Sequence, residues 1–465
     1  MTDIKDANVK LICSKLQNAG YEAFVVGGAV RDNIMGKNPH DYDITSNASP
    51  ADIKRLFSGY FQILEIGEAF GITAVVVNGT PYEIAQYRKD IGGNGRKPDS
   101  VEMVRDIEID LARRDFTMNA IAMDPISGII RDPFAGSVDI LDKIIDFVGD
   151  PAARIVEDKL RILRAFRFMS QLSFTISDES LTAIKAFINL GGDFSSVSQE
   201  RITAELSKLF VGPNAFETIK LMFEIGLMQI LIPETVRLLE DHNSGWHREE
   251  MAPFGNSILA HVLNVVKFME TEMQKVEEDR LILMLAALLH DIGKPLVREG
   301  KPDGFDRFHT HDIVGANLTS EILVRMKFSN DIVNRVTNLV KMHMNIHNLL
   351  VMKDIAKIRK LLGKSDFHLM KILGFCDTIG SSKNGKIPNF EEAENFVKKV
   401  DELIEQFGCE LPLPIINGNN LIEAGFKPGP EFKRALDIAF NEQLRGISKK
   451  QKLLNQSISF LKNIS

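Results

Sequence analysis

Two hydrophobic periods divide the chain near residue 150. Before that point, short runs rich in β-branched and aromatic residues alternate with segments of helical period, a pattern that predicts a small mixed sheet with helices. One helix is expected to begin at Pro50, with Ser49 as its N-cap. Three glycines and a proline in residues 90–99 predict a mobile loop. The predicted strands are residues 24–28, 42–46, 61–67, 72–77 and 81–87.

After residue 150 the 3.6-residue apolar period dominates, as in residues 155–169, 200–210 and 217–231. A polar segment at 241–256 and a proline- and glycine-rich break at 411–418 separate the helical blocks. The expected fold class is therefore α+β, a mixed head followed by helices. The expected domains are a head at 1–150, a helical neck at 151–240, a helical domain at 250–400 and a helical tail at 401–465.

Composition narrows the class of protein. With 44% apolar and 26% charged residues the chain is typical of a water-soluble protein, and its 465 residues predict about three domains. The longest apolar run, residues 281–289, is about half of what a membrane span needs, and the acidic N-terminus is unlike a signal peptide. Three cysteines without a CxxC pair argue against a disulfide framework and predict a reducing, cytoplasmic compartment.

The net charge of −7 argues against a surface that is basic throughout, but nucleic-acid binding needs only a local basic face. Two segments are candidates for such a face. One is the arginine-rich stretch 154–167, and the other is residues 427–462, which hold eight Lys and Arg against three Asp and Glu. For the second segment, a solvated helix face is an equally good interpretation.

Asp41 and Asp43 are the first candidates for chemistry. They lie at the start of a predicted strand, where residues i and i+2 share a face with Cα atoms about 6.5–7 Å apart. Two carboxylates at that spacing suit a pair of Mg²⁺ ions about 3.5–4 Å apart, which activate an attacking hydroxyl and neutralise a leaving pyrophosphate. An Asp-x-Asp pair alone is more often a turn or an exposed strand edge, so its neighbours decide the interpretation.

Glycine and arginine motifs flank this pair. The motif GGAVRD at 27–32 follows a predicted strand and opens a helix, where Gly28 lets the backbone approach a triphosphate and Arg31 adds positive potential. By itself, a plain strand–helix turn is the more common explanation. Downstream, RRDFTMNA at 113–120 places Arg113 and Arg114 beside an acid in an apolar stretch, and arginine binds phosphate oxygens in bidentate fashion.

Five motifs, in order over residues 24–205, resemble those of class II tRNA nucleotidyltransferases and bacterial poly(A) polymerases of the DNA polymerase β superfamily. They are GGAVRD with DYD at 41–43, RRDFTMNA, DPF-x-G at 132–136, EDKLRILR at 157–164, and Glu200-Arg201 with Glu205. The resemblance implies a DNA polymerase β-like nucleotidyltransferase head in which Asp41 and Asp43 are catalytic and bind Mg²⁺. It also implies nucleotide-binding roles for Gly28, Arg31, Arg114, Asp158, Arg161, Arg164 and Arg167.

The fourth motif predicts how a base is read. Asp158 and Arg161 are three residues apart on an expected helix and so share a face. A carboxylate accepts from the exocyclic amine of cytosine or adenine, and a guanidinium donates to the ring acceptors; guanine and uracil present the opposite pattern. Spacing alone favours an ion pair within the helix, whereas the resemblance favours base selection.

The resemblance leaves one position of the head open. The superfamily often carries a third carboxylate on a neighbouring strand, and Glu83 is the candidate in this sequence. A glutamate on the surface of a strand is an equally good interpretation. No general base is evident in the sequence, and the resemblance implies none beyond metal-assisted deprotonation of the 3′-hydroxyl.

A second group of chemical residues lies in the helical middle of the chain. His290 and Asp291 end an apolar helix, where buried polar groups need partners, and imidazole with carboxylate suits a transition-metal or Mg²⁺ site. The order H…HD…H…H…D resembles the HD metal-dependent phosphohydrolase superfamily, with Ni²⁺, Mn²⁺ or Mg²⁺ as the expected ion. His309 is an alternative to His311 in this pattern. The full ligand set is His261, His290, Asp291, His311, His343 and Asp377.

The leading hypothesis is template-independent addition of CCA to the 3′ end of tRNA from CTP and ATP. The resemblance implies that the HD domain hydrolyses 2′,3′-cyclic or terminal phosphates, which would repair a damaged end first; an inactive HD scaffold is the alternative. The tail segment 421–436 also resembles this family and implies tRNA binding through phosphates and shape. Rival functions are A-adding, CC-adding or poly(A)-synthesising activity, an HD phosphohydrolase with an inactive RNA-binding head, and a non-enzymatic RNA chaperone.

Overall fold

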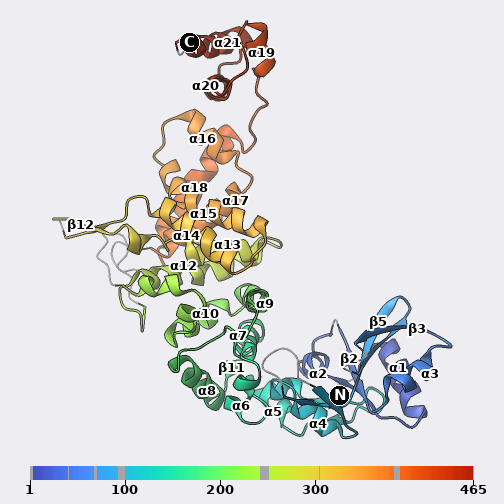
Figure 1. Cartoon of the computed structure of the whole chain (residues 1–465). Helices are drawn as coiled ribbons and strands as arrows, with labels where there is room; N and C mark the ends of the chain where they lie inside the picture. Colours follow the sequence, from blue (N-terminus) through green and yellow to red (C-terminus); the bar gives the residue numbers. More distant parts are fainter. Residues whose placement is uncertain are drawn as a thin grey trace. The chain divides into compact units, whose positions relative to one another are not determined.

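The computed structural model describes residues 4–39, 41–67, 71–92, 100–240, 251–302, 304–381 and 388–463. The chain divides into two compact units, Met1–Leu231 and Ile232–Ser465. Figure 1 shows a sheet with helices in the first unit and helices almost throughout the second. The expected fold class, a mixed α+β head followed by helices, is confirmed.

The head is built on a mixed sheet of seven strands in the order β3-β4-β5-β2-β1-β8-β9. Strands β2 and β5 are parallel, whereas the other neighbouring pairs are antiparallel. All five predicted strands are present, within a few residues of their expected ends. The strands are β1 (Ala23–Val26), β2 (Asp43–Ser46), β3 (Gln62–Gly67), β4 (Ile72–Val77), β5 (Thr80–Gln86), β8 (Ala122–Met123) and β9 (Ile130–Arg131).

Helices of the head pack against this sheet. On one face Phe24 and Val26 of β1 cluster with Ile107 and Leu111, which belong to α4 (Ile107–Ala112). Ser49 caps α3 through a reciprocal capping box with Asp52, as the sequence predicts. The other helices here are α1 (Ala7–Asn18), α2 (Gly28–Ile34) and α3 (Pro50–Phe57).

Part of the segment predicted to be a loop is strand. Asp90 and Ile91 belong to the ladder that β6 (Arg88–Ile91) forms with β7 (Ser100–Met103), where Asp90 is opposite Val101 and Ile91 is opposite Ser100. Residues 93–99, which hold most of the predicted loop, lie outside the described residues, as does 241–250 from the predicted boundary.

One predicted helix is two helices. The apolar period runs through residues 155–169, but the first helix, α6 (Pro151–Glu157), stops before Asp158, whose backbone is extended. The second helix, α7 (Leu160–Leu172), starts two residues after Asp158. The Asp158 carboxylate accepts from the backbone N–H of Leu160, a local bond of the kind by which aspartate competes with helix. The remaining helices of this unit are α5 (Gly136–Asp142), α8 (Asp178–Asn189), α9 (Gln199–Phe210), α10 (Ala215–Glu224) and α11 (Leu227–Leu231).

Among its described residues, the second unit has helices and two short strands, β12 (Glu299–Gly300) and β13 (Asp306–Arg307). Its helix α13 (Arg280–Leu289) is apolar around most of its circumference, and its residues from Ile282 to Leu289 are buried. No helix in the described part of the chain is long and apolar enough to cross a membrane. The helices are α12 (Ile258–Glu272), α13 (Arg280–Leu289), α14 (His311–Arg325), α15 (Asn330–Leu349), α16 (Ile355–Leu362), α17 (Phe367–Ile379) and α18 (Phe390–Phe407).

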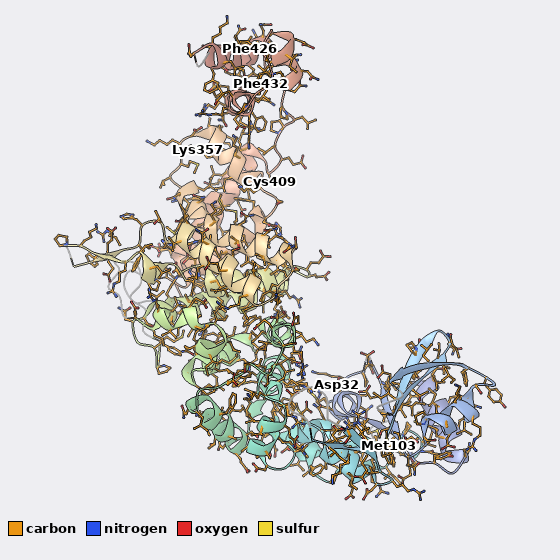
Figure 2. The ribbon with its side chains drawn as sticks, in the orientation of Figure 1. Asp32, Met103, Lys357, Cys409, Phe426 and Phe432 are labelled. Carbon is orange, nitrogen blue, oxygen red and sulfur yellow. The ribbon has the colours of Figure 1, made fainter. Side chains whose placement is uncertain are left out.

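The C-terminal segment forms a small core of its own. Phe426 and Phe432, labelled in Figure 2, pack against buried Leu421 and Leu461. The segment contains α19 (Gly418–Glu423), α20 (Glu431–Leu444) and α21 (Lys450–Lys462). Arg445, directly after α20, pairs with Asp354 at the start of α16.

Candidate functional site

Three carboxylates of the head are brought to neighbouring strands. Asp43 is the first residue of β2 and Asp41 lies two residues before it; both side chains are exposed. In the parallel pair β2–β5, Ile44 is opposite Ile84, so Asp43 and Glu83 are neighbours one step earlier in the register. Ile44 and Ile84 are buried on one face, and strand alternation therefore puts Asp43 and Glu83 on the other.

Gly27 lies against the side chains of Asp43 and Arg114. It caps α2 with φ +71° and ψ −136°, a conformation that is strained for any residue with a Cβ. A Cβ at Gly27 would lie 3.1 Å from Nη1 of Arg114 and 3.8 Å from Oδ2 of Asp43. Gly28, the glycine singled out from the sequence, is instead close to Arg31. The positive φ and the close approach to Arg114 require glycine at Gly27, whereas the 3.6 Å between a Cβ at Gly28 and Arg31 is an ordinary contact distance.

Arg114 is a largely buried cation at the same place. Burial lowers the pKa of Arg114, and the nearby carboxylates of Asp110 and Asp43 oppose that shift. An arginine side chain stays protonated in proteins under such conditions. Arg114 is therefore a fixed positive charge beside Asp43, in the position where a triphosphate bound at that carboxylate would need one.

A chain of polar contacts joins three of the motifs. Arg31 donates to Asp32 through Nε and Nη2 and to Asn119 through Nη1, at 2.9, 2.7 and 2.9 Å. Asn119 donates to Asp115 at 3.3 Å, and Oδ2 of Asp115 lies 2.7 Å from Nη2 of Arg164. Segments far apart in the sequence therefore converge around one polar centre in the first unit.

The expected Asp158–Arg161 arrangement is wrong in its local geometry. Asp158 lies between two helices rather than on one, and its carboxylate pairs with Arg201 of α9 at 2.7 Å. Arg161 donates to Glu157 at 2.6 Å and to the backbone oxygen of Arg154 at 3.0 Å. Neither the helix face shared by the two residues nor the ion pair between them is present. Arg161 is held by Glu157, four residues earlier in the same motif, whereas Asp158 is held by Arg201, a partner that the local spacing does not indicate.

Arg167 does lie on α7 with Arg164, as predicted, and it too is held by α9. Its Nε is 2.5 Å from Oε2 of Glu205, and its guanidinium lies over the ring of Phe168 at 4.0 Å. The fourth and fifth motifs are thus linked by Arg201 and Asp158, and Glu205 of the fifth motif also pairs with Arg167, three residues after the fourth.

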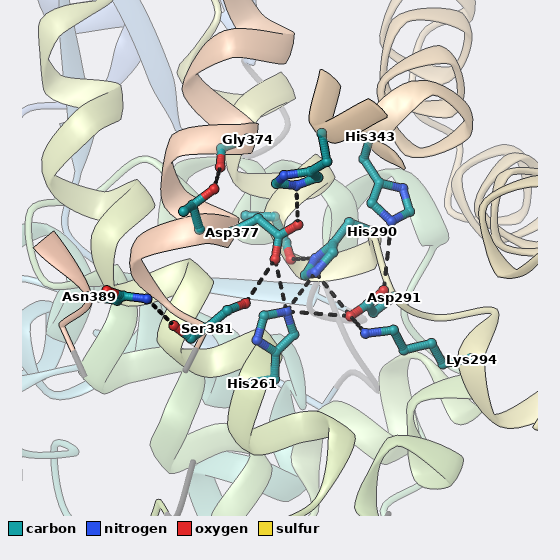
Figure 3. A network of polar contacts seen from close by, with 12 residues as sticks. His261, His290, Asp291, Lys294, His343, Gly374, Asp377, Ser381 and Asn389 are labelled. Atoms are coloured by element: carbon teal, nitrogen blue, oxygen red, sulfur yellow. Dashed lines mark hydrogen bonds and ion pairs between the residues drawn. The ribbon is translucent and has the colours of Figure 1, made fainter. Parts of the chain in front are cut away.

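The second unit brings the predicted HD residues together, and Figure 3 labels His261, His290, Asp291, His343 and Asp377 among them. Nε2 of His261 is 3.2 Å from Nε2 of His290, and Nε2 of His311 is 3.0 Å from Nε2 of His343. Asp291 belongs to both groups: with His261 and His290 it forms one possible set of three ligands, and with His311 and His343 another. All five side chains are buried.

The hydrogen bonds of the Nδ1 atoms show that Nε2 is the ring nitrogen that faces the centre of the cluster as an acceptor. Nδ1 of His290, His311 and His343 lies 2.8, 2.7 and 2.6 Å from a backbone carbonyl oxygen, so each Nδ1 carries the proton. Facing Nε2 acceptors about 3 Å apart repel one another unless a cation lies between them. Burial lowers the pKa of His343 to about 3, which keeps it neutral, as a metal ligand must be.

Asp377 reaches the cluster from α17. Its Oδ1 is 3.2 Å from Nε2 of His261, and its Oδ2 is 2.8 Å from Nε2 of His347. His347 was missed from the sequence, although its spacing from His343, four residues on one helix, was the available signal.

Two further observations define the HD cluster. Lys294, also missed, lies three residues after Asp291, and its Nζ is 2.6 Å from Oδ2 of that carboxylate. Of the two competing histidines, His311 is buried in the cluster whereas His309 is exposed. His311 therefore fits the ligand set.

Family models match three parts of the chain. Residues 23–146 match the poly A polymerase head domain, and residues 258–369 match the HD domain. Residues 173–239 match the probable RNA- and SrmB-binding site of polymerase A. The chain carries a poly A polymerase head domain and an HD domain. At the level of these two domains, the resemblances drawn from the five motifs and from the histidine pattern are confirmed.

Curated relatives are CCA-adding enzymes. The one from Geobacillus thermodenitrificans is 43% identical over 221 residues, which is 47% of this chain and 53% of that enzyme. The one from Leuconostoc mesenteroides is 36% identical over 262 residues, 55% of this chain and 62% of that enzyme. The aligned part of the chain thus spans about half the length of the curated relatives it matches.

Solved structures extend the likeness along the whole chain. The CCA-adding enzyme of Bacillus stearothermophilus in complex with CTP has a TM-score of 0.68 at 26% identity, with 98% of each chain covered. The Thermotoga maritima CCA-adding enzyme complexed with tRNA shares the fold, with a TM-score of 0.63 at 19% identity over 98% of this chain and 97% of that one. A polymerase-type head and an HD domain together indicate a protein that uses divalent metal ions.

Proposed function

We propose that this protein adds CCA, without a nucleic-acid template, to the 3′ end of tRNA from CTP and ATP. One observation carries the proposal: Asp43, Gly27 and Arg114 meet at one end of the sheet. The full-length likeness to a CCA-adding enzyme in complex with CTP supports it. The proposed compartment is the cytoplasm, which suits three free cysteines.

The proposed metal at the head is Mg²⁺, held by Asp41 and Asp43. Exposed carboxylates on a strand end offer the oxygen donors that Mg²⁺ prefers, and Glu83 is the proposed third carboxylate. The ion would lower the pKa of the tRNA 3′-hydroxyl and neutralise the leaving pyrophosphate. Gly27 leaves room for the nucleotide, and Arg114 supplies charge to its phosphates.

Base selection is assigned to Asp158 and Arg161. Asp158 would accept from the exocyclic amine of cytosine or adenine, and Arg161 would donate to the ring acceptors. Arg31, Arg164 and Arg167 are proposed to surround the same nucleotide, since their partners lie in the motifs that converge here. The protein itself would then replace a template.

The proposal is tested with three tRNA transcripts that lack the last three, two or one nucleotides. Each is incubated with CTP, ATP or both, and product lengths are read at single-nucleotide resolution. Full CCA addition extends all three to the same mature end. Extension of the last transcript only, by one A, would indicate an A-adding enzyme, extension that stops after two C residues a CC-adding enzyme, and long A tracts poly(A) synthesis.

A second function is favoured by the HD cluster. We propose that it binds divalent metal and hydrolyses phosphate esters, including 2′,3′-cyclic ends of tRNA that must be opened before a nucleotide can be added. The buried cluster of imidazoles around Asp291 supports metal binding, because the Nε2 atoms of His311 and His343 face one another 3.0 Å apart and a bound cation would relieve their repulsion. One water opens the cyclic phosphate to a 2′- or 3′-monoester, and a second water releases inorganic phosphate. Both products are measured on a cyclic-ended tRNA with Ni²⁺, Mn²⁺ or Mg²⁺, and the absence of both with all three ions would exclude the proposal.

Two substitutions distinguish this pair of activities from an HD phosphohydrolase with an idle head. Asp41→Ala is expected to abolish nucleotide addition and leave phosphate release intact, while His290→Ala does the reverse. If Asp41→Ala left nucleotide addition unchanged, the head would not be the transferase.

The basic segment 427–462 is proposed to bind tRNA phosphates, so affinity for tRNA should fall as salt rises.

A further inference from the structure

Asp158 is oriented by two contacts that do not involve any nucleotide. One carboxylate oxygen accepts from the backbone N–H of Leu160 at 3.0 Å, and the other lies 2.7 Å from Nη2 of Arg201. The backbone at Asp158 is extended, with φ −149° and ψ 104°, and Leu160, the first residue of α7, contacts the carboxylate only through its backbone. Arg201 is therefore the side chain that determines where this carboxylate points.

The helix that carries Arg201 is well anchored. It lies in the first turn of α9, which packs along α7, and one turn later Glu205 pairs with Arg167 of α7 at 2.5 Å. The side chains of Arg201 and Asp158 are 21% and 16% exposed, so the pair is shielded from most of the solvent. A guanidinium carried on this anchored helix is suited to hold a carboxylate through a charge-assisted hydrogen bond.

We propose that Arg201 is a positioning residue that sets nucleotide selectivity through Asp158. The inference rests on the proposed function, in which Asp158 reads the base. A fixed carboxylate accepts from the amine of cytosine or adenine and repels the carbonyl oxygen that uracil or guanine places there. A carboxylate released from Arg201 rotates away from that oxygen, so the penalty against the wrong base is lost while the right base still binds.

The test compares the wild-type protein with Arg201→Met, Arg201→Lys and Lys208→Ala. Lys208 is an exposed cation of the same helix, so its removal controls for charge. For each protein, kcat and KM are measured separately with CTP and UTP on tRNA lacking its last three nucleotides, and with ATP and GTP on tRNA lacking only the last.

The kcat/KM ratio of CTP over UTP, and of ATP over GTP, is expected to fall about tenfold in Arg201→Met, the lower range of what one good base contact contributes. Arg201→Lys keeps the positive charge but loses the planar guanidinium, so its kcat/KM ratios should lie between those of the wild type and Arg201→Met. The ratios of Lys208→Ala should match those of the wild type. Arg201→Lys also decides the matter if Arg201→Met does not fold.

A purely structural role for Arg201 predicts a different result. All four nucleotides would then lose efficiency by the same factor, and unchanged ratios in both Arg201 variants would overturn the inference. If the wild-type protein adds no nucleotide to any transcript, the proposed function fails and this inference fails with it. An active wild type with unchanged ratios in the variants overturns only the inference.

Discussion

Asp115 and Arg164 form an ion pair of 2.7 Å that joins the second motif to the fourth. Burial alone would raise the pKa of Asp115. Arg164, Asn119 and the backbone N–H of Phe116 outweigh burial, so the pKa lies below the ordinary value of a carboxyl group. The carboxylate is therefore charged at neutral pH, and it holds two side chains that border the proposed nucleotide site.

Replacing this carboxylate by an amide should destabilise the head in a pH-dependent way. Asp115→Asn removes a charged hydrogen-bond partner, which costs about 2 kcal/mol in the free energy of unfolding at pH 7. Because the folded pKa is lowered, the stabilisation from Asp115 is present above the unfolded carboxyl pKa of about 4 and is lost as pH falls through the folded value. Urea unfolding of both proteins at pH 7 and pH 3 should thus show that the difference between their free energies of unfolding is smaller at pH 3. A difference that does not depend on pH would contradict this assignment.

Gly27→Ala tests the close approach of the first motif to Arg114. Positive φ with a Cβ costs about 1–3 kcal/mol, and the new Cβ would lie 3.1 Å from the guanidinium. We expect loss of stability together with a higher KM for both CTP and ATP. Gly36→Ala is the control, because Gly36 also has positive φ, +73°, but no atom lies within 4 Å of the place that a Cβ would take there. Equal KM values in the two variants would show that Gly27 matters only for the backbone.

The sequence-based predictions succeeded where local pattern was sufficient. Strand alternation predicted the placement of Asp43, and the Ser49 cap followed from local residue order. The pairing of Asp158 with Arg201 joins residues 43 positions apart, which apolar periodicity does not report. Periodicity also ran through the break at Asp158, because a local side-chain hydrogen bond leaves the apolar pattern unchanged.

The register between β2 and β5 yields a prediction for Glu83. Since the sequence shows strands but not their partners, only the structure places Glu83 beside Asp43. If Glu83 helps to hold the proposed Mg²⁺, Glu83→Gln should lower kcat about tenfold or more and raise the Mg²⁺ concentration needed for half-maximal addition. Its side chain is exposed, so stability should change by less than about 0.5 kcal/mol. Glu179→Gln, an exposed glutamate of α8, is the control; identical Mg²⁺ dependence in both variants would make Glu83 a surface residue.

Asp291 belongs to two ligand groups, and this predicts two metal ions per HD domain rather than one. After dialysis against Mn²⁺ or Ni²⁺, elemental analysis should show two equivalents more in the wild type than in Asp291→Asn, because each HD ion loses the shared carboxylate and the head is unchanged. His347→Asn, which removes only the partner of Asp377, should weaken metal affinity about 10–100-fold. Metal should also raise the unfolding temperature of the wild type, since it binds the folded state alone. His309→Ala removes an exposed histidine and should keep both ions. One equivalent of metal at the HD domain of the wild type would contradict the shared role of Asp291. No metal at that domain would contradict the metal centre itself.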